Sequence, residues 1–177
     1  PSSMRFFTSL FFCFALVVSG SAQLTVLELL AAAPSNSHFN DIVSNDDLNA
    51  LLDSETDLTV LVPNNDAIDA YAAAMGMTTA DFIASESAVD MALYHIVPNE
   101  AIMFSALSGE SVVTTALGMP ISFQEYEVVN ATNVAAADLE VSNGVVHLLD
   151  EVVVLSDGIY QWLDASTQHN YLSLIHI

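Results

Sequence analysis

Apolar residues recur at different spacings in the two halves of the chain. Between residues 24 and 93 they recur mostly every three or four positions, as on one face of an α-helix. From residue 111 onward the apolar runs are β-branched or alternate with polar residues, as in β-strands, and turn residues separate them. The predicted helices cover residues 24–33, 37–53 (with a break near Asn45), 64–76, 78–85 and 87–93. The predicted strands cover residues 58–63, 94–97, 111–117, 120–129, 133–141 and 145–155.

This order of elements predicts an α+β fold. A helix-rich half followed by a strand-rich half differs from the regular alternation of β-α-β units. The chain has 177 residues, of which 53% are hydrophobic, so it can build one substantial core. Residues 64–76 show the clearest helix boundaries, because Asn64 or Asn65 can cap the start and Gly76 can close the end.

The strands near the C-terminal end contain the strongest turn signal and an unexpected histidine. Asn143-Gly144 predicts a hairpin. Strand alternation places His147 on one face with Val145 and Leu149, among apolar side chains. His95 has a similar apolar setting if the preceding strand reaches back to it.

Both histidines are interpreted as buried rings with hydrogen-bond partners. Two alternatives stay open. His95 could act in recognition together with Tyr94, or His95 and His147 could bind a metal ion. No further ligand has the spacing to join such a pair, so we expect no metal site.

The first residues have the pattern of a secretory signal peptide. Arg5 precedes a run of 13 apolar and small residues, and small residues follow up to Ala22. The run is short for a membrane span, so we expect cleavage before Gln23 and no membrane span afterwards. The predicted organisation is upstream residues and signal peptide at 1–22, one domain at 23–157, and a C-terminal tail at 158–177. Part of that tail is a candidate for non-native sequence.

The charge balance limits the partners of the chain. It carries 22 acidic residues and a single basic residue, Arg5, for a formal net charge of -21. Nucleic acids are recognised through lysine and arginine, so they are excluded as partners, and anionic lipid surfaces are disfavoured for the same reason. Residues 53–57 alternate like the start of a calcium-binding loop, but Leu58 and Asn64 stand where glycine and glutamate are needed. Only weak association with divalent cations is expected.

The sequence contains no pattern typical of an enzyme. There is no G-x-S-x-G nucleophile motif and no glycine-rich phosphate loop, and the only cysteine lies in the predicted signal peptide. We therefore expect no catalytic residues and no cofactor.

A glycosylation sequon begins at Asn130. Residues 130–132 read Asn-Ala-Thr, which is an acceptor sequence in a secreted chain. The alternative interpretation is a plain turn between two strands.

Three blocks of sequence, in order, resemble the fasciclin domain family. They are "LTVLVPNNDAI" from residue 58, "ALYHIVP" from residue 92, and "NVAAADLEVSNGVVHLLDEVVVL" from residue 133. The resemblance extends over residues 24–155. Departures in the first block, at Leu61, Val62 and Ile68, exchange one apolar residue for another, whereas Asn64 stands where threonine is usual.

This resemblance implies a wedge-shaped α+β domain with a β-sandwich-like core flanked by several short helices. It also implies an extracellular module for cell adhesion or matrix binding, whose ligand is a protein or a glycan. In some animal members the Tyr-His pair has been linked to integrin binding, so we expect a binding site at Tyr94, His95, Ile96, Val97 and Pro98. The resemblance makes Asn143, Gly144 and His147 a structural motif. The alternative function is an acidic secreted protein that binds ions or structures a matrix.

Overall fold

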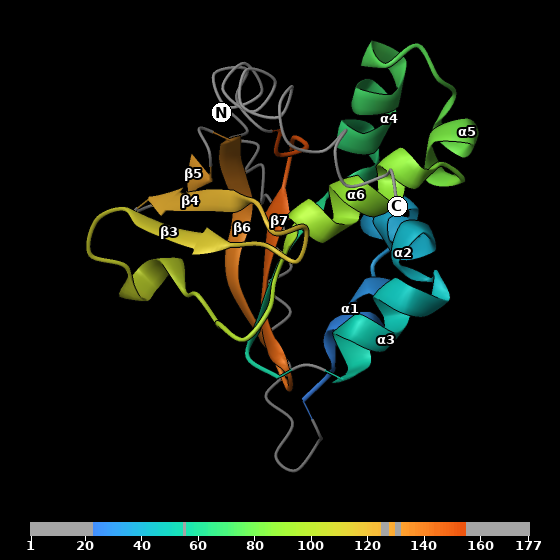
Figure 1. The fold of residues 1–177 in the computed structure, drawn as a ribbon. Helices are drawn as coiled ribbons and strands as arrows, with labels where there is room; N and C mark the ends of the chain where they lie inside the picture. Colours follow the sequence, from blue (N-terminus) through green and yellow to red (C-terminus); the bar gives the residue numbers. More distant parts are fainter. Residues whose placement is uncertain (1–22, 55, 125–127, 130–131, 155–177) are drawn as a thin grey trace, which may run out of the picture.

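The computed structural model describes residues 23–54, 56–124, 128–129 and 132–154. The predicted signal peptide, the predicted tail and Asn130 lie outside these residues, so the predictions made for them stay predictions. The described part contains both helices and strands, and it confirms the α+β class (Figure 1). Its helices are α1 (Val26–Ala31), α2 (Ser37–Val43), α3 (Asp46–Ser54), α4 (Asn65–Ala74), α5 (Thr79–Ile83) and α6 (Glu86–Tyr94), with 3-10 helices η1 (Pro34–Asn36) and η2 (Phe104–Ala106).

The helices begin at side chains that cap them. Thr25 and Glu28 form a reciprocal capping box at α1, and Asn64 accepts a hydrogen bond from the backbone N–H of Ala67 at the start of α4. Gly76 follows α4 with a φ of 73°, as a residue that closes a helix. Both predicted boundaries of this helix and the predicted break near Asn45 are confirmed.

The described strands form one hydrogen-bonded series in the order β2-β1-β7-β6-β5-β4-β3. Only the central pair, β1 and β7, is parallel. In Figure 1, β3 and β4 run across the direction of β6 and β7, which gives the strands their sandwich-like arrangement. The bounds are β1 (Leu58–Pro63), β2 (Ile96–Val97), β3 (Ser111–Thr114), β4 (Pro120–Gln124), β5 (Val128–Val129), β6 (Thr132–Val141) and β7 (Gly144–Leu149).

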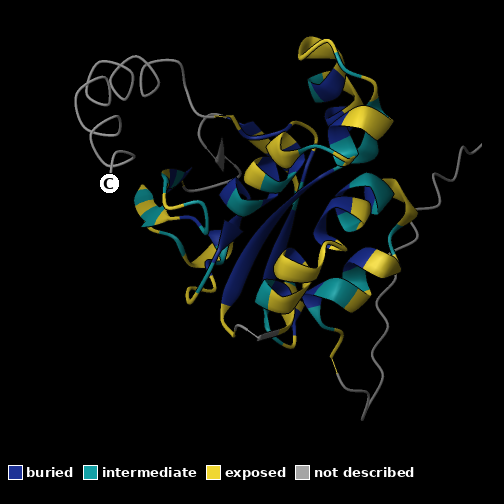
Figure 2. Ribbon diagram, turned by 45° about the vertical axis from the view of Figure 1, so that its right-hand side comes forward, coloured by how far each residue is buried: buried dark blue, intermediate teal, exposed yellow. Residues whose placement is uncertain are grey.

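Hydrophobic side chains lie on both faces of the central strands. Every residue of β1 is buried, which explains why its sequence is an almost continuous apolar run. Val60 and Val62 join the core cluster beneath the helices, whereas Leu61 joins a second cluster that contains Phe104 and Phe123. Figure 2 shows the buried central strands with the exposed faces of the helices turned outward.

Several predicted strands are shorter in the structure, and the strand expected at residues 111–117 ends at Thr114. The strand expected at residues 94–97 contains only Ile96 and Val97, because α6 continues to Tyr94 and His95 caps that helix. The strand expected at residues 145–155 begins at Gly144 and ends at Leu149.

The predicted hairpin is present, but its turn lies one residue earlier than the sequence suggested. Val141 pairs with Gly144, so the two loop residues are Ser142 and Asn143. Gly144 is the first residue of β7 and pairs with Leu58 of β1. A Cβ atom on Gly144 would lie 2.2 Å from the carbonyl oxygen of Leu58. Glycine is therefore required by the close approach of β1.

Gly144→Ala is expected to reduce the free energy of unfolding by about 3 kcal/mol or more, because the strands must separate to accept the methyl group. Gly76→Ala is the matched control. Gly76 has a positive φ but no atom within 4 Å of an added Cβ, so it should lose only about 1–2 kcal/mol. Chemical denaturation measures both changes. Equal losses in the two variants would contradict the close-approach explanation.

Candidate binding site

His147 is a fully buried ring in the middle of β7. Its Nδ1 accepts a hydrogen bond from the N–H of Asp138 at 3.1 Å, so Nε2 carries the proton and donates to the carbonyl of Ile102 at 2.9 Å. The ring of Phe104 packs edge-on against it, with centroids 4.5 Å apart. Burial lowers the pKa of His147, although the bond to Ile102 and the nearby Asp138 carboxylate oppose this. The prediction that His147 is buried is confirmed.

Asp138 completes the attachment of the 102–106 segment to the sheet. It has a φ of 58°, and its carboxylate accepts hydrogen bonds from the N–H groups of Phe104 at 2.7 Å and Ser105 at 3.0 Å. Partial burial acts to raise the pKa of Asp138, but the hydrogen bonds from Ser105 and Phe104 outweigh it and lower that pKa. The histidine and the aspartate therefore hold η2 against β6 and β7.

His95 is also fully buried, at the C-terminal end of α6. The N–H of Val153 donates to its Nε2 at 3.0 Å, so Nδ1 carries the proton and donates to the carbonyl of Met91 at 2.7 Å. Burial lowers the pKa of His95 to about 4, against the opposing effect of the bond to Met91. The ring therefore joins α6 to the segment that follows β7.

The segment predicted to bind a ligand is mostly inside the protein. Tyr94, Ile96 and Val97 are buried, as is His95, and Pro98 is half-buried. Ile96 and Val97 pair with β1, and the hydroxyl of Tyr94 donates to the carbonyl of Pro120 at 3.1 Å. Four of these five residues are therefore buried, and only Pro98 is partly exposed.

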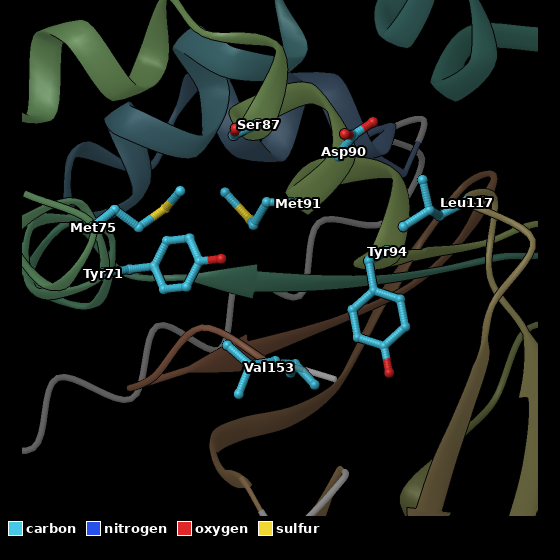
Figure 3. Close-up of a pocket in the computed structure, with 9 residues that line it drawn as sticks. Tyr71, Met75, Ser87, Asp90, Met91, Tyr94, Leu117 and Val153 are labelled. Atoms are coloured by element: carbon cyan, nitrogen blue, oxygen red, sulfur yellow. The ribbon is translucent and has the colours of Figure 1, made fainter. Parts of the chain in front are cut away.

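A pocket of about 210 Å³ lies beside this segment (Figure 3). Tyr94 lines it, and His95 bonds two further lining residues, Met91 and Val153. The structure thus brings the predicted pair to the pocket in different ways, with Tyr94 in the wall and His95 behind it. The complete lining comes from α4 and its C-terminal cap (Tyr71 and Met75), from α6 (Ser87, Asp90, Met91 and Tyr94), from the turn between β3 and β4 (Leu117), and from the segment after β7 (Val153 and Val154).

The inner and outer parts of the pocket differ in exposure. Met91, Tyr94 and Val153 are buried, whereas Met75 and Val154 are 44% and 50% exposed. These two are among only four large hydrophobic side chains that are exposed in the described residues. Two separate exposed apolar residues therefore converge on one concave site, which is a common property of binding sites.

Part of the lining of this pocket could be predicted from the spacing of residues in the sequence. Ser87, Asp90, Met91 and Tyr94 follow the i, i+3, i+4, i+7 spacing of one helix face, and the residues contributed by α4 are four apart. The spacing identifies the two faces, but it does not show that they meet each other and the segment after β7. Sequence reasoning therefore missed all lining residues except Tyr94.

The fasciclin domain family model matches residues 34–155. The chain belongs to the fasciclin domain family. This confirms the resemblance found in the three sequence blocks. The family is associated with cell adhesion, and fasciclin domains occur in extracellular or surface proteins.

Two known proteins show how far the similarity of this fasciclin domain extends. Protein sll1483 of Synechocystis sp. is 30% identical over 145 residues, which cover 78% of this chain and 79% of that protein. A FAS1 domain pair from the insect cell adhesion molecule Fasciclin I has the same fold, with a TM-score of 0.58 and 19% identity. That match covers 79% of this chain and spans 54% of the insect chain.

Neither a metal-binding cluster nor a membrane-spanning helix is present in the described part of the fasciclin domain. Within it, no three histidine, cysteine, aspartate or glutamate residues are grouped to hold a metal ion. No helix among the same residues is long and apolar enough to cross a membrane.

The fasciclin domain is expected to lose stability as the pH falls from 6.5 to about 4. In this window an unfolded His95 binds a proton, whereas the folded ring, with its pKa near 4, does not. The neutral ring stabilises the fold fully above pH 6.5, and roughly 3 kcal/mol of this contribution is lost by pH 4. Denaturation at several pH values measures the slope.

His95→Gln provides the comparison, because glutamine keeps a donor and an acceptor but does not titrate in this range. The variant should be less stable at pH 7 and should show a shallower slope. The many surface carboxylates contribute equally to both proteins. Identical slopes in the two proteins would show that His95 is not responsible.

Proposed function

We propose that this fasciclin domain is a secreted, non-enzymatic module that binds an extracellular protein or glycan in cell adhesion or matrix interaction. The pocket between α4, α6 and the segment after β7 is its binding site. The observation that carries the proposal is the convergence of the exposed Met75 and Val154 on one concave site. Exposed large hydrophobic side chains are rare in the described residues, so two of them at one concavity are distinctive.

The shape of the pocket depends on the residues around the Tyr-His pair. Tyr94 is the ligand-contacting member of the predicted segment, because its ring forms part of the wall. His95 positions the site, since its two nitrogens bond the backbone of Met91 and Val153 on opposite sides of it. Ile96 and Val97 hold this corner against β1.

The alternative function, ion binding by surface carboxylates, has less support. In the described residues the carboxylates do not gather into a group that could hold a metal ion. Net charge would attract divalent cations to the whole surface, without selecting a place on it.

Met75→Ala combined with Val154→Ala should weaken ligand binding roughly tenfold, because truncating two apolar contacts removes about 1.4 kcal/mol or more. The matched control truncates the other two exposed large hydrophobics, Leu24 and Val112, which lie outside the pocket lining. Binding is measured on arrays of immobilised matrix proteins and glycans. Equal binding by the two double variants, or no binding by the unaltered protein, would overturn the proposal.

A further inference from the structure

We propose that the pocket receives an arginine side chain from a partner protein. The guanidinium group would lie by the rings of Tyr71 and Tyr94, near the carboxylate of Asp90, with its aliphatic stem against Met75. This inference rests on the proposed function, because it names the chemistry of the ligand at the same site.

The size of the pocket favours one long side chain. Its volume of about 210 Å³ is below the ~300–1,000 Å³ that is typical of pockets for complete small-molecule ligands. The base is closed by Met91 and Val153, which are both buried. A side chain that projects from a partner's surface can fill such a site without any change in the backbone.

The side chains that line the pocket favour a planar cation. Figure 3 shows the rings of Tyr71 and Tyr94 on two sides of the pocket, with the hydroxyl of Tyr71 directed into it and Asp90 nearby on α6. Tyrosine rings attract cations at their faces, and a guanidinium is planar, weakly hydrated and able to stack on them. Methionine side chains adapt to the shape of an aliphatic stem.

The charges of the chain make a cationic ligand the complementary one. Asp90 is exposed at the mouth, and beyond Arg5 the chain has no lysine or arginine to neutralise it. A purely apolar occupant would remove water from this carboxylate without compensation. A sugar would bring several hydroxyl groups to a lining whose non-aromatic polar side chains are only Ser87 and Asp90. The net charge of -21 also steers basic partners toward the protein.

The test uses the peptide acetyl-Gly-Ser-Arg-Ser-Gly-amide and the same peptide with citrulline, which has the shape of arginine without its charge. The methyl signals of the methionines are followed by NMR during titration of the purified protein. Met75 and Met91 line the pocket, whereas Met103 lies at a different site and reports non-specific binding. The arginine peptide should shift Met75 and Met91 saturably, with little change at Met103. Citrulline should bind roughly fivefold more weakly.

Asp90→Asn should weaken binding of the arginine peptide by roughly fivefold and leave citrulline binding unchanged. Asp41→Asn is the matched control, because it removes the same charge from an exposed position on α2 outside the pocket lining. Equal effects of the two substitutions, equal binding of the two peptides, or an equal shift of Met103 would each overturn the inference.

Failure of this inference is distinguishable from failure of the proposed function. If Met75→Ala with Val154→Ala weakens binding to an immobilised ligand while Asp90→Asn leaves it unchanged, the pocket binds a ligand other than arginine. A glycan that binds in this way would identify the other ligand class. If the pocket variants leave all binding unchanged, the proposed function itself fails.

Discussion

The rest of the fold depends on the parallel pairing of β1 with β7. The side chain of Asn143, at the start of this pairing, bonds it to the helices. The two strands pair from Leu58 opposite Gly144 to the ends of both, and Leu58 donates its N–H to the carbonyl of Asn143. The amide side chain of Asn143 accepts from the N–H of Val26 and donates to the carbonyl of Leu52. One turn residue therefore bonds the first helix, the third helix and the central strand. It joins the helix-rich half of the chain to the strand-rich half.

The same framework determines where the pocket lies. β7 carries His147, which holds the segment around Ile102, and the chain then continues to Val153. There the buried His95 fixes Val153 against Met91 of α6. Both rings are neutral and fully bonded, and neither faces a ligand. They act by holding two segments in place, and His95 thereby shapes the pocket that Tyr94 lines.

Features that depend on interactions between residues close in the sequence could be predicted from the sequence. Asn64 and Gly76 mark the ends of α4 through interactions within a few residues, so pattern alone located that helix. Alternation along β7 was enough to place His147 inside. Tyr94 was assigned to a strand because a β-branched pair follows it, whereas packing of α6 extends the helix through it. The role of Gly144 could not be predicted from the local sequence, because it arises from contact with Leu58, which is distant in the sequence. The pocket was equally inaccessible to prediction, because its walls come from four separate segments.

Native-state hydrogen exchange of the protein and of Asn143→Asp measures how far Asn143 couples the helices to the sheet. The substitution keeps an oxygen acceptor for the amide of Val26, but it replaces the donor to Leu52 with a second oxygen. The amides of α3, β1 and β7 are expected to lose protection together, by a similar free energy of roughly 1–3 kcal/mol. Loss of protection confined to α3, with β1 and β7 unchanged, would contradict the claim that Asn143 couples the helices to the sheet.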